Sequence, residues 1–103
     1  MGVRRGDVHL LNKFTDQGAK NIGNLRKSVE ANMARGEHLG IKIHGWYLTQ
    51  GRYDVVVVVE AADAETLLAN AAGVAGTGNF RTETLRAFTL DEADQAIKRV
   101  SGA

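Results

Sequence analysis

Five consecutive valines, Val55–Val59, constrain the fold more than any other feature of this 103-residue chain. A β-strand points alternate side chains to opposite faces, so a strand of valines is apolar on both faces. The helices of a small domain with one sheet cover only one face of that sheet. We therefore expect the valine strand in the middle of the sheet, with helices against one face and a second copy of the chain against the other.

Composition narrows the class of protein. The length is that of one domain, residues 1–103. The formal charge of +1 is too balanced for attraction to nucleic acid or an acidic membrane, and the longest aliphatic run is too short to span a bilayer. The chain has no cysteine, which excludes disulfides and thiolate chemistry. We expect a cytoplasmic protein without a signal peptide, and neither a nucleic-acid nor a membrane partner.

Turn residues and hydrophobic periodicity predict seven elements. The expected strands cover 8–14, 41–49, 54–60 and 79–88. A helix capped by Thr15 or Asp16 precedes the second strand, and one capped by Asp63 precedes the fourth. Thr89 and Glu92 form a capping box that opens a short last helix.

The expected order is β-α-β-β-α-β with a C-terminal helix, which is the ferredoxin-like arrangement of an α+β protein. Right-handed crossovers place strands one and three in the middle of a four-stranded antiparallel sheet, with two helices on one face. The other face keeps about half of the valines without cover, and a homodimer or higher homo-oligomer, sheet against sheet, would bury them. The alternative is a monomer whose last helix folds back over this face.

The hairpin predicts which residues share a face. If Gln50-Gly51 is a two-residue turn, Trp46 pairs with Val55. The uncovered face then carries Lys42, His44, Trp46, Leu48, Tyr53, Val55 and Val57, and the helix-covered face carries Ile43, Gly45, Tyr47, Thr49, Arg52, Asp54, Val56 and Val58. On the first strand, His9, Leu11 and Lys13 belong to the uncovered face, whereas for the fourth strand both assignments stay open.

His44 is the best single candidate for chemistry, because histidine can act as a base or an acid near neutral pH. The commoner case is a histidine at the rim of an edge strand. The spacing of the histidines fits no familiar metal motif, and no metal or cofactor is expected.

An aromatic cluster beside a cation and a carboxylate is the densest functional pattern, and it could orient a small ring-shaped or acidic ligand. The candidate ligand-binding residues are His44, Trp46, Tyr47, Arg52, Tyr53, Asp54 and Arg86. In the alternative interpretation, Arg52 and Asp54 only complete the hairpin. RNA binding is not expected, because strands one and three present aliphatic rather than aromatic side chains.

The segment Tyr47-Leu48-Thr49 followed by Gly51-Arg52-Tyr53-Asp54 and a valine-rich strand resembles the GYD domain family. Phe14–Gly18 and Asn79–Thr89 are also similar to that family. The resemblance covers most of residues 8–90 and implies a small bacterial or archaeal cytoplasmic protein of the dimeric α+β barrel type, without an established biochemical function.

Three functions are compatible with these observations. The first is a homo-oligomer that binds a small ligand between the sheets of two subunits. The second is a cofactor-independent oxygenase or isomerase with His44 as base and Arg86 or Arg52 stabilising an anion, an interpretation that rests on fold analogy. The third is a structural or partner-binding module without a ligand.

Overall fold

The structure is a computed structural model that describes residues 8–101. Its elements are β1 (Val8–Phe14), α1 (Asp16–Lys20), a 3₁₀ turn η1 (Ile22–Asn24), α2 (Leu25–His38), β2 (Lys42–Leu48), β3 (Val55–Glu60), α3 (Ala64–Gly76), β4 (Phe80–Arg86) and α4 (Leu90–Ser101). The order of the strands in the sheet is β2-β3-β1-β4, and all neighbours are antiparallel. This confirms the predicted α+β fold, with the valine strand β3 in the interior of the sheet.

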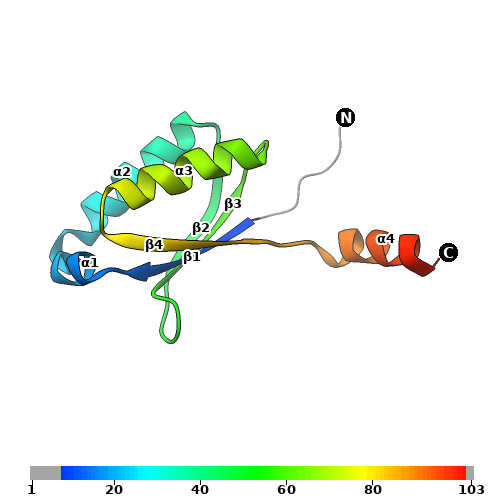
Figure 1. Cartoon of the computed structure of the whole chain (residues 1–103), viewed down its shortest axis with the longest axis horizontal. Coiled ribbons are helices and arrows are strands. Elements are labelled where there is room, and N and C mark those ends of the chain that lie inside the picture. The colour runs from blue at the N-terminus through cyan, green and yellow to red at the C-terminus, as the bar shows by residue number, and fades with distance from the viewer. Residues whose placement is uncertain (1–7, 102–103) are drawn as a thin grey trace.

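The sheet has one covered face. Figure 1 shows α2 and α3 side by side over the same face, while α4 continues outward from β4 and does not return over the sheet. The radius of gyration of 15.6 Å exceeds the roughly 13 Å of a compact domain of about 100 residues, as an extended arm requires. The alternative in which the last helix roofs the other face is therefore wrong.

The predicted helix caps are all present. The side chain of Thr15 accepts a hydrogen bond from the Gly18 N–H at 3.0 Å, and that of Asp63 accepts one from the Thr66 N–H at 2.8 Å. In the capping box, the N–H groups of Thr89 and Glu92 each donate to the side chain of the other, at 2.8 and 3.1 Å. Short-range sequence patterns thus locate where each of these helices begins.

The first predicted helix is interrupted. It divides into α1 and α2 at the turn η1, which contains Gly23. Ile22 is 48% exposed and does not belong to the half-buried apolar stripe of Leu25, Val29 and Met33. Glycine lowers helix propensity, and a short 3₁₀ turn lets the chain change direction between the two helical segments.

The two faces of the valine strand are assigned the other way round from the prediction. Val55, Val57 and Val59 are buried beneath the helices, whereas Val56 and Val58 are half-buried on the opposite face. A run of five that begins and ends with valine places three side chains on one face and two on the other. The face with three buries more apolar area under the helices, so that set forms the core.

The β2–β3 hairpin also differs from the predicted register. Trp46 pairs with Val57, and the Thr49 N–H donates to the Asp54 carbonyl at 2.8 Å, so the loop has four residues, 50–53, rather than two. The displacement is two residues, which keeps Trp46 on the same face as Val55 and Val57. Trp46 therefore lies on the helix-covered side with them, and not on the uncovered side as predicted.

Candidate functional site

The face of the sheet opposite the helices, here called the open face, has an apolar centre between charged ends. The register places His9, Leu11 and Lys13 of β1 opposite Leu85, Glu83 and Arg81 of β4, which settles the face of the fourth strand. On β3, Val56 and Val58 pair with Leu11 and His9. No helix among residues 8–101 covers this surface (Figure 1).

Tyr47 belongs to the open face, although the hairpin predicted it on the helix side. It pairs with Val56, and its side chain is 56% exposed. Its ring lies over Gly45, where an added Cβ would come within 2.6 Å of the Tyr47 hydroxyl. A side chain at position 45 would push the tyrosine away, so glycine is required there for this aromatic to lie flat on the sheet.

Tyr53 crosses one end of the open face. Its hydroxyl donates to Glu83 Oε2 at 3.1 Å, and the Lys13 ammonium lies 5.6 Å from the centre of its ring. The hydrogen bond to Glu83 is the main reason that the pKa of Tyr53 is raised, while the nearby charge of Arg52 opposes the shift. The loop residue Tyr53 is thereby connected to both β1 and β4.

His44 lies at the other end of the open face, at a bulge in β2. The bulge falls between Ile43 and Gly45, and His44 Nε2 is 3.2 Å from Glu60 Oε1. Both side chains are partly exposed, at 44% and 30%. A carboxylate that orients an imidazole is a common arrangement for a general base, and equally for an exposed pair at a sheet edge.

Arg86 is not near His44. Arg86 lies on β4, the edge strand at the other side of the sheet from β2, and pairs with Val8 of β1. Its guanidinium lies 5.4 Å from the centre of the Phe88 ring. The register places it in the row of Thr82 and Thr84, on the helix side of the sheet. The structure thus does not bring together the predicted base His44 and Arg86, one of the two arginines that were candidates to stabilise an anion.

The residues of the Gly-Tyr-Asp motif have structural roles. Gly51 has φ of +117°, a conformation that favours glycine. Asp54 Oδ2 accepts from the Phe14 N–H at 2.8 Å, and the Asp54 N–H donates to the Asn12 carbonyl at 2.9 Å. Asp54 therefore joins the hairpin to the end of β1, as the interpretation of a hairpin-completing residue requires. Arg52 is exposed in the loop.

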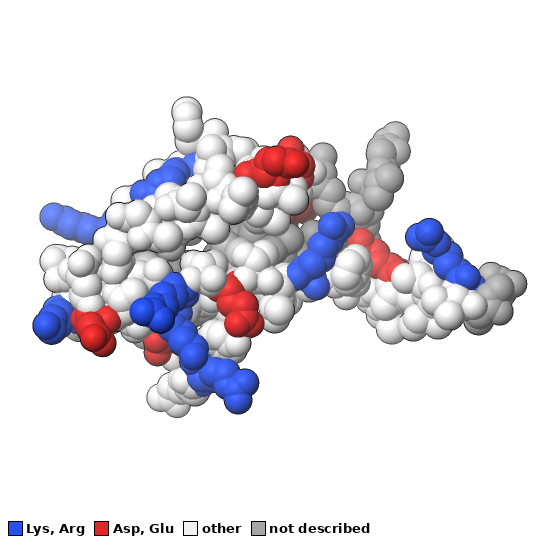
Figure 2. Space-filling model, in the orientation of Figure 1, with Lys and Arg blue, Asp and Glu red and all other residues white. Residues whose placement is uncertain are grey.

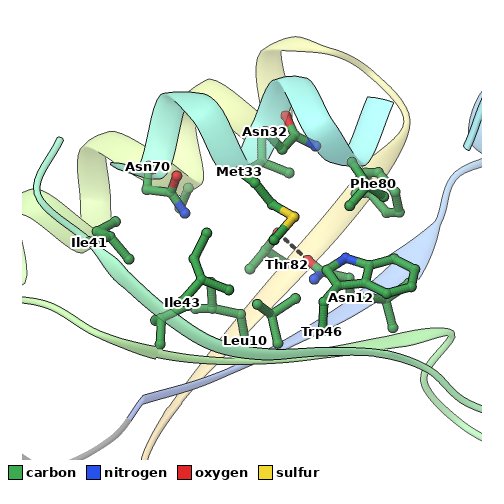
Figure 3. A pocket seen from close by; sticks show the side chains of 17 residues that line it. Leu10, Asn12, Asn32, Met33, Ile41, Ile43, Trp46, Asn70, Phe80 and Thr82 are labelled. Atoms are coloured by element: carbon green, nitrogen blue, oxygen red, sulfur yellow. Dashed lines mark hydrogen bonds between the residues drawn. The ribbon is translucent and has the colours of Figure 1, made fainter. Parts of the chain in front are cut away.

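A cavity lies on the other side of the sheet, inside the protomer. Its volume is about 60 Å³. The walls are α2, α3 and the covered face of the sheet, and one side is open to the surface (Figure 3). Trp46 lines it with valines of β3 and three asparagines, Asn12, Asn32 and Asn70. The sequence reasoning missed this cavity. The available signal was amides within otherwise apolar faces of a strand and two helices.

Other kinds of site find no support in the described part of the chain. Residues 8–101 contain no group of three or more His, Asp or Glu side chains that could hold a metal ion. None of the helices described is long and apolar enough to cross a membrane. Figure 2 shows acidic and basic side chains interspersed on the visible face, without a broad region of one sign.

Two comparisons find known proteins that are similar to this chain in sequence. A family model described as GYD domain matches residues 10–97. A protein of Thermus thermophilus named "Glutamine synthetase and cystathionine beta-lyase binding protein" is 31% identical over 90 residues, which cover 86% of this chain and 95% of that protein. No solved structure matches the chain significantly.

Proposed function

The chain belongs to the GYD domain family, and from that premise we propose that it is a homo-oligomeric protein-binding module that pairs through its open face and holds a second protein with α4. The observation that carries the proposal is the helix α4, which stands away from the sheet (Figure 1) and whose large apolar side chains are exposed. The name of the Thermus relative, a binding protein for two enzymes, also supports a protein-binding function.

Helix α4 has the amphipathic pattern of a helix that packs against another surface. Leu90, Ile97 and Val100 are 85%, 64% and 89% exposed and fall on one stripe at helical spacing, together with Ala93. Lys98 and Asp94 form an ion pair at 3.2 Å. An isolated helix of 12 residues is marginally stable in water, so contact with a partner would also stabilise α4 itself.

The open face supports self-association. Val56 and Val58 stay half-buried beside Leu11, and Leu85 is 46% exposed. An aliphatic surface on the two interior strands, with His9 and Glu83 as the polar side chains in the same rows, suits a two-fold contact between identical faces. The valines on this face are Val56 and Val58, not the predicted Val55 and Val57.

Light scattering after size exclusion tests the dimer. Val58→Asp places a charge at the centre of the open face and should shift the mass from dimer to monomer at micromolar concentrations. Ile22→Asp is the matched control, because Ile22 is an exposed β-branched residue in the η1 turn. A wild-type chain that is monomeric at 100 µM, or a Val58→Asp variant that remains dimeric, would contradict the proposed interface.

Binding to defined enzymes tests the partner. Glutamine synthetase and cystathionine β-lyase from the same organism, each purified, are titrated against the immobilised chain. We expect binding to at least one, weakened at least tenfold by Ile97→Asp and unchanged by Gln95→Asp, which adds the same charge on the opposite side of α4. Absence of binding to both, or equal losses in the two variants, would reject this function.

A small-ligand site between the sheets of two subunits is a second candidate, favoured by the polar group of Tyr53, Glu83 and Lys13 beside the apolar centre. Benzoate and related ring-shaped acids should then raise the melting temperature of the wild type and not of Tyr53→Phe. Turnover that is lost in His44→Ala would instead favour the cofactor-independent enzyme.

We further propose a bacterial, cytoplasmic location, which fits the absence of cysteine.

A further inference from the structure

We propose that the cavity inside each protomer binds a small, uncharged and mainly hydrocarbon molecule whose carbonyl oxygen accepts hydrogen bonds from asparagine amides, chiefly that of Asn70. The site lies between the helices and the sheet, on the opposite side from the open face (Figure 3). It does not depend on the oligomeric state or on a protein partner, so each proposal can fail without the other.

Asn70 is the main reason for the proposal. It is a buried residue of α3, only 7% exposed, and it lines the cavity. No hydrogen bond to its side-chain amide occurs among the described residues. Among residues 8–101, every side-chain nitrogen or oxygen that is fully inaccessible to solvent has a hydrogen-bond partner. Because the amide of Asn70 has no such partner, its atoms are not fully inaccessible, and they face space that water or a ligand can reach. Buried amides are normally paired, and a ligand in the cavity would supply the missing partner.

The other two asparagines indicate which hydrogen-bonding group the ligand needs. Asn32 Oδ1 accepts from Arg35 Nη1 at 2.8 Å, and because a guanidinium only donates, the NH₂ of Asn32 is left to donate elsewhere. Asn12 Oδ1 accepts from the Thr82 hydroxyl at 2.6 Å, which also leaves an NH₂ group. Two residues that line the cavity therefore keep NH₂ donors without a hydrogen bond to the described residues, and a carbonyl oxygen is the complementary group.

The rest of the lining excludes a charged ligand. The residues that line the cavity include no acidic or basic side chain, and most are aliphatic or aromatic. Transfer of an ion into such surroundings without a counter-charge is strongly unfavourable. In Figure 3, Met33 of α2 points from the helix toward Thr82 and Asn12 of the sheet, and its flexible side chain can adapt to an occupant.

The volume limits the size. A cavity of about 60 Å³ has room for roughly four to six water molecules at about 10–15 Å³ each. That corresponds to a molecule of about five non-hydrogen atoms, or to the end of a longer molecule that leaves through the opening. Cyclobutanone, a ketone with five heavy atoms, is a suitable probe, and cyclopentane is its apolar counterpart.

Gly36 provides a variant that should fold well. A Cβ at this position of α2 would lie 3.6 Å from Asn70 Oδ1 and 3.9 Å from carbons of Ile41 and Ile43, which is ordinary contact. Gly36→Ala therefore fills part of the cavity without a clash, and alanine favours a helix more than glycine does. Gly76→Ala is the matched control, because Gly76 is also helical and its Cβ would have no neighbour within 4 Å.

The experiment is a titration of the ¹⁵N-labelled chain with each probe, followed by NMR. The side-chain NH₂ signals of Asn70 and the indole N–H of Trp46, the single tryptophan, should shift saturably with cyclobutanone in the millimolar range. We expect Gly36→Ala to raise the dissociation constant at least fivefold and Gly76→Ala to leave it within twofold. Asn70→Ala should remove at least fivefold of the preference for the ketone over cyclopentane.

Three results would overturn the proposal: no saturable shift with cyclobutanone, the same affinity in Gly36→Ala as in the wild type, or equal affinities of the wild type for cyclobutanone and cyclopentane. If Asn70→Ala does not fold, the Gly36 and Gly76 variants still decide the location of the site. The comparison of the two probes in the wild type still decides the need for a carbonyl.

Discussion

The replacement of Asp54 tests whether the aspartate of the Gly-Tyr-Asp motif supports the fold rather than a ligand. Its carboxylate accepts from the Phe14 N–H at 2.8 Å, and its backbone bonds to both Asn12 and Thr49. Asp54→Ala removes a hydrogen bond to a charged group and leaves the Phe14 N–H without its partner. Such a bond contributes about 1.5–3 kcal/mol, so we expect a loss of about 2 kcal/mol in the free energy of unfolding.

Asp54→Asn is the matched control. It keeps an oxygen in the same place but lowers the bond to the neutral class, worth about 0.5–1.5 kcal/mol, so its loss should be about half as large. Urea unfolding at one fixed protein concentration measures both variants, because self-association changes apparent stability. With a slope of about 1–2 kcal/mol/M, the midpoint of Asp54→Ala should fall by about 1–2 M.

The reasoning is refuted if Asp54→Ala unfolds within 0.5 kcal/mol of the wild type. It is also refuted if the asparagine variant loses as much stability as the alanine variant, because the acceptor oxygen would then not be the source of the effect. A normal stability for Asp54→Ala together with lost ligand binding would instead return Asp54 to the ligand-binding residues.

Three further predictions concern single contacts. Gly18→Ala should lower the free energy of unfolding by more than about 2 kcal/mol, because its Cβ would clash with the backbone oxygen of Asn79. Gly23→Ala should change it by less than about 0.5 kcal/mol, because its Cβ would have no neighbour within 4 Å. Equal stabilities of the two variants in chemical unfolding would contradict this packing. The raised pKa of Tyr53 means that the tyrosine–glutamate bond contributes fully below pH 10.0 and loses its contribution as the pH rises through the higher folded-state pKa; ultraviolet titration in a Tyr47→Phe background should show a lower pKa of Tyr53 in Glu83→Ala, which removes both the acceptor oxygen and the charge, and an unchanged curve would show that Glu83 is not the cause. Thr89→Ala should destabilise the first turn of α4 by about 0.5–2 kcal/mol, whereas Thr89→Ser keeps the capping hydroxyl and should not. Amide hydrogen exchange measures the protection of this turn, and equal protection in the two variants would contradict the role of the cap.

Some features of the candidate site could be predicted and others could not. The position of His44 on the open face was predicted, but through a regular strand, whereas the structure reaches it through a bulge. That bulge is why His44 and Trp46 lie on opposite sides of the sheet despite being two residues apart. Gly45, a lone glycine within the strand, is the one sequence signal of a bulge there, but whether and where the bulge forms depends on how the paired strand and the layers above it pack.

The order of the elements, the caps at Thr15, Asp63 and Thr89, and the interior position of the valine strand could all be predicted from the residues alone. These follow from interactions within a few residues and from the right-handedness of strand crossovers. Only the tertiary structure decided that Val55, Val57 and Val59 face the helices, that the hairpin loop has four residues, and that a cavity with Asn70 forms beneath α2 and α3. Valine occurs on both faces of the strand, three on one and two on the other, so residue type alone does not choose between them, and the total area that the packed layers bury does.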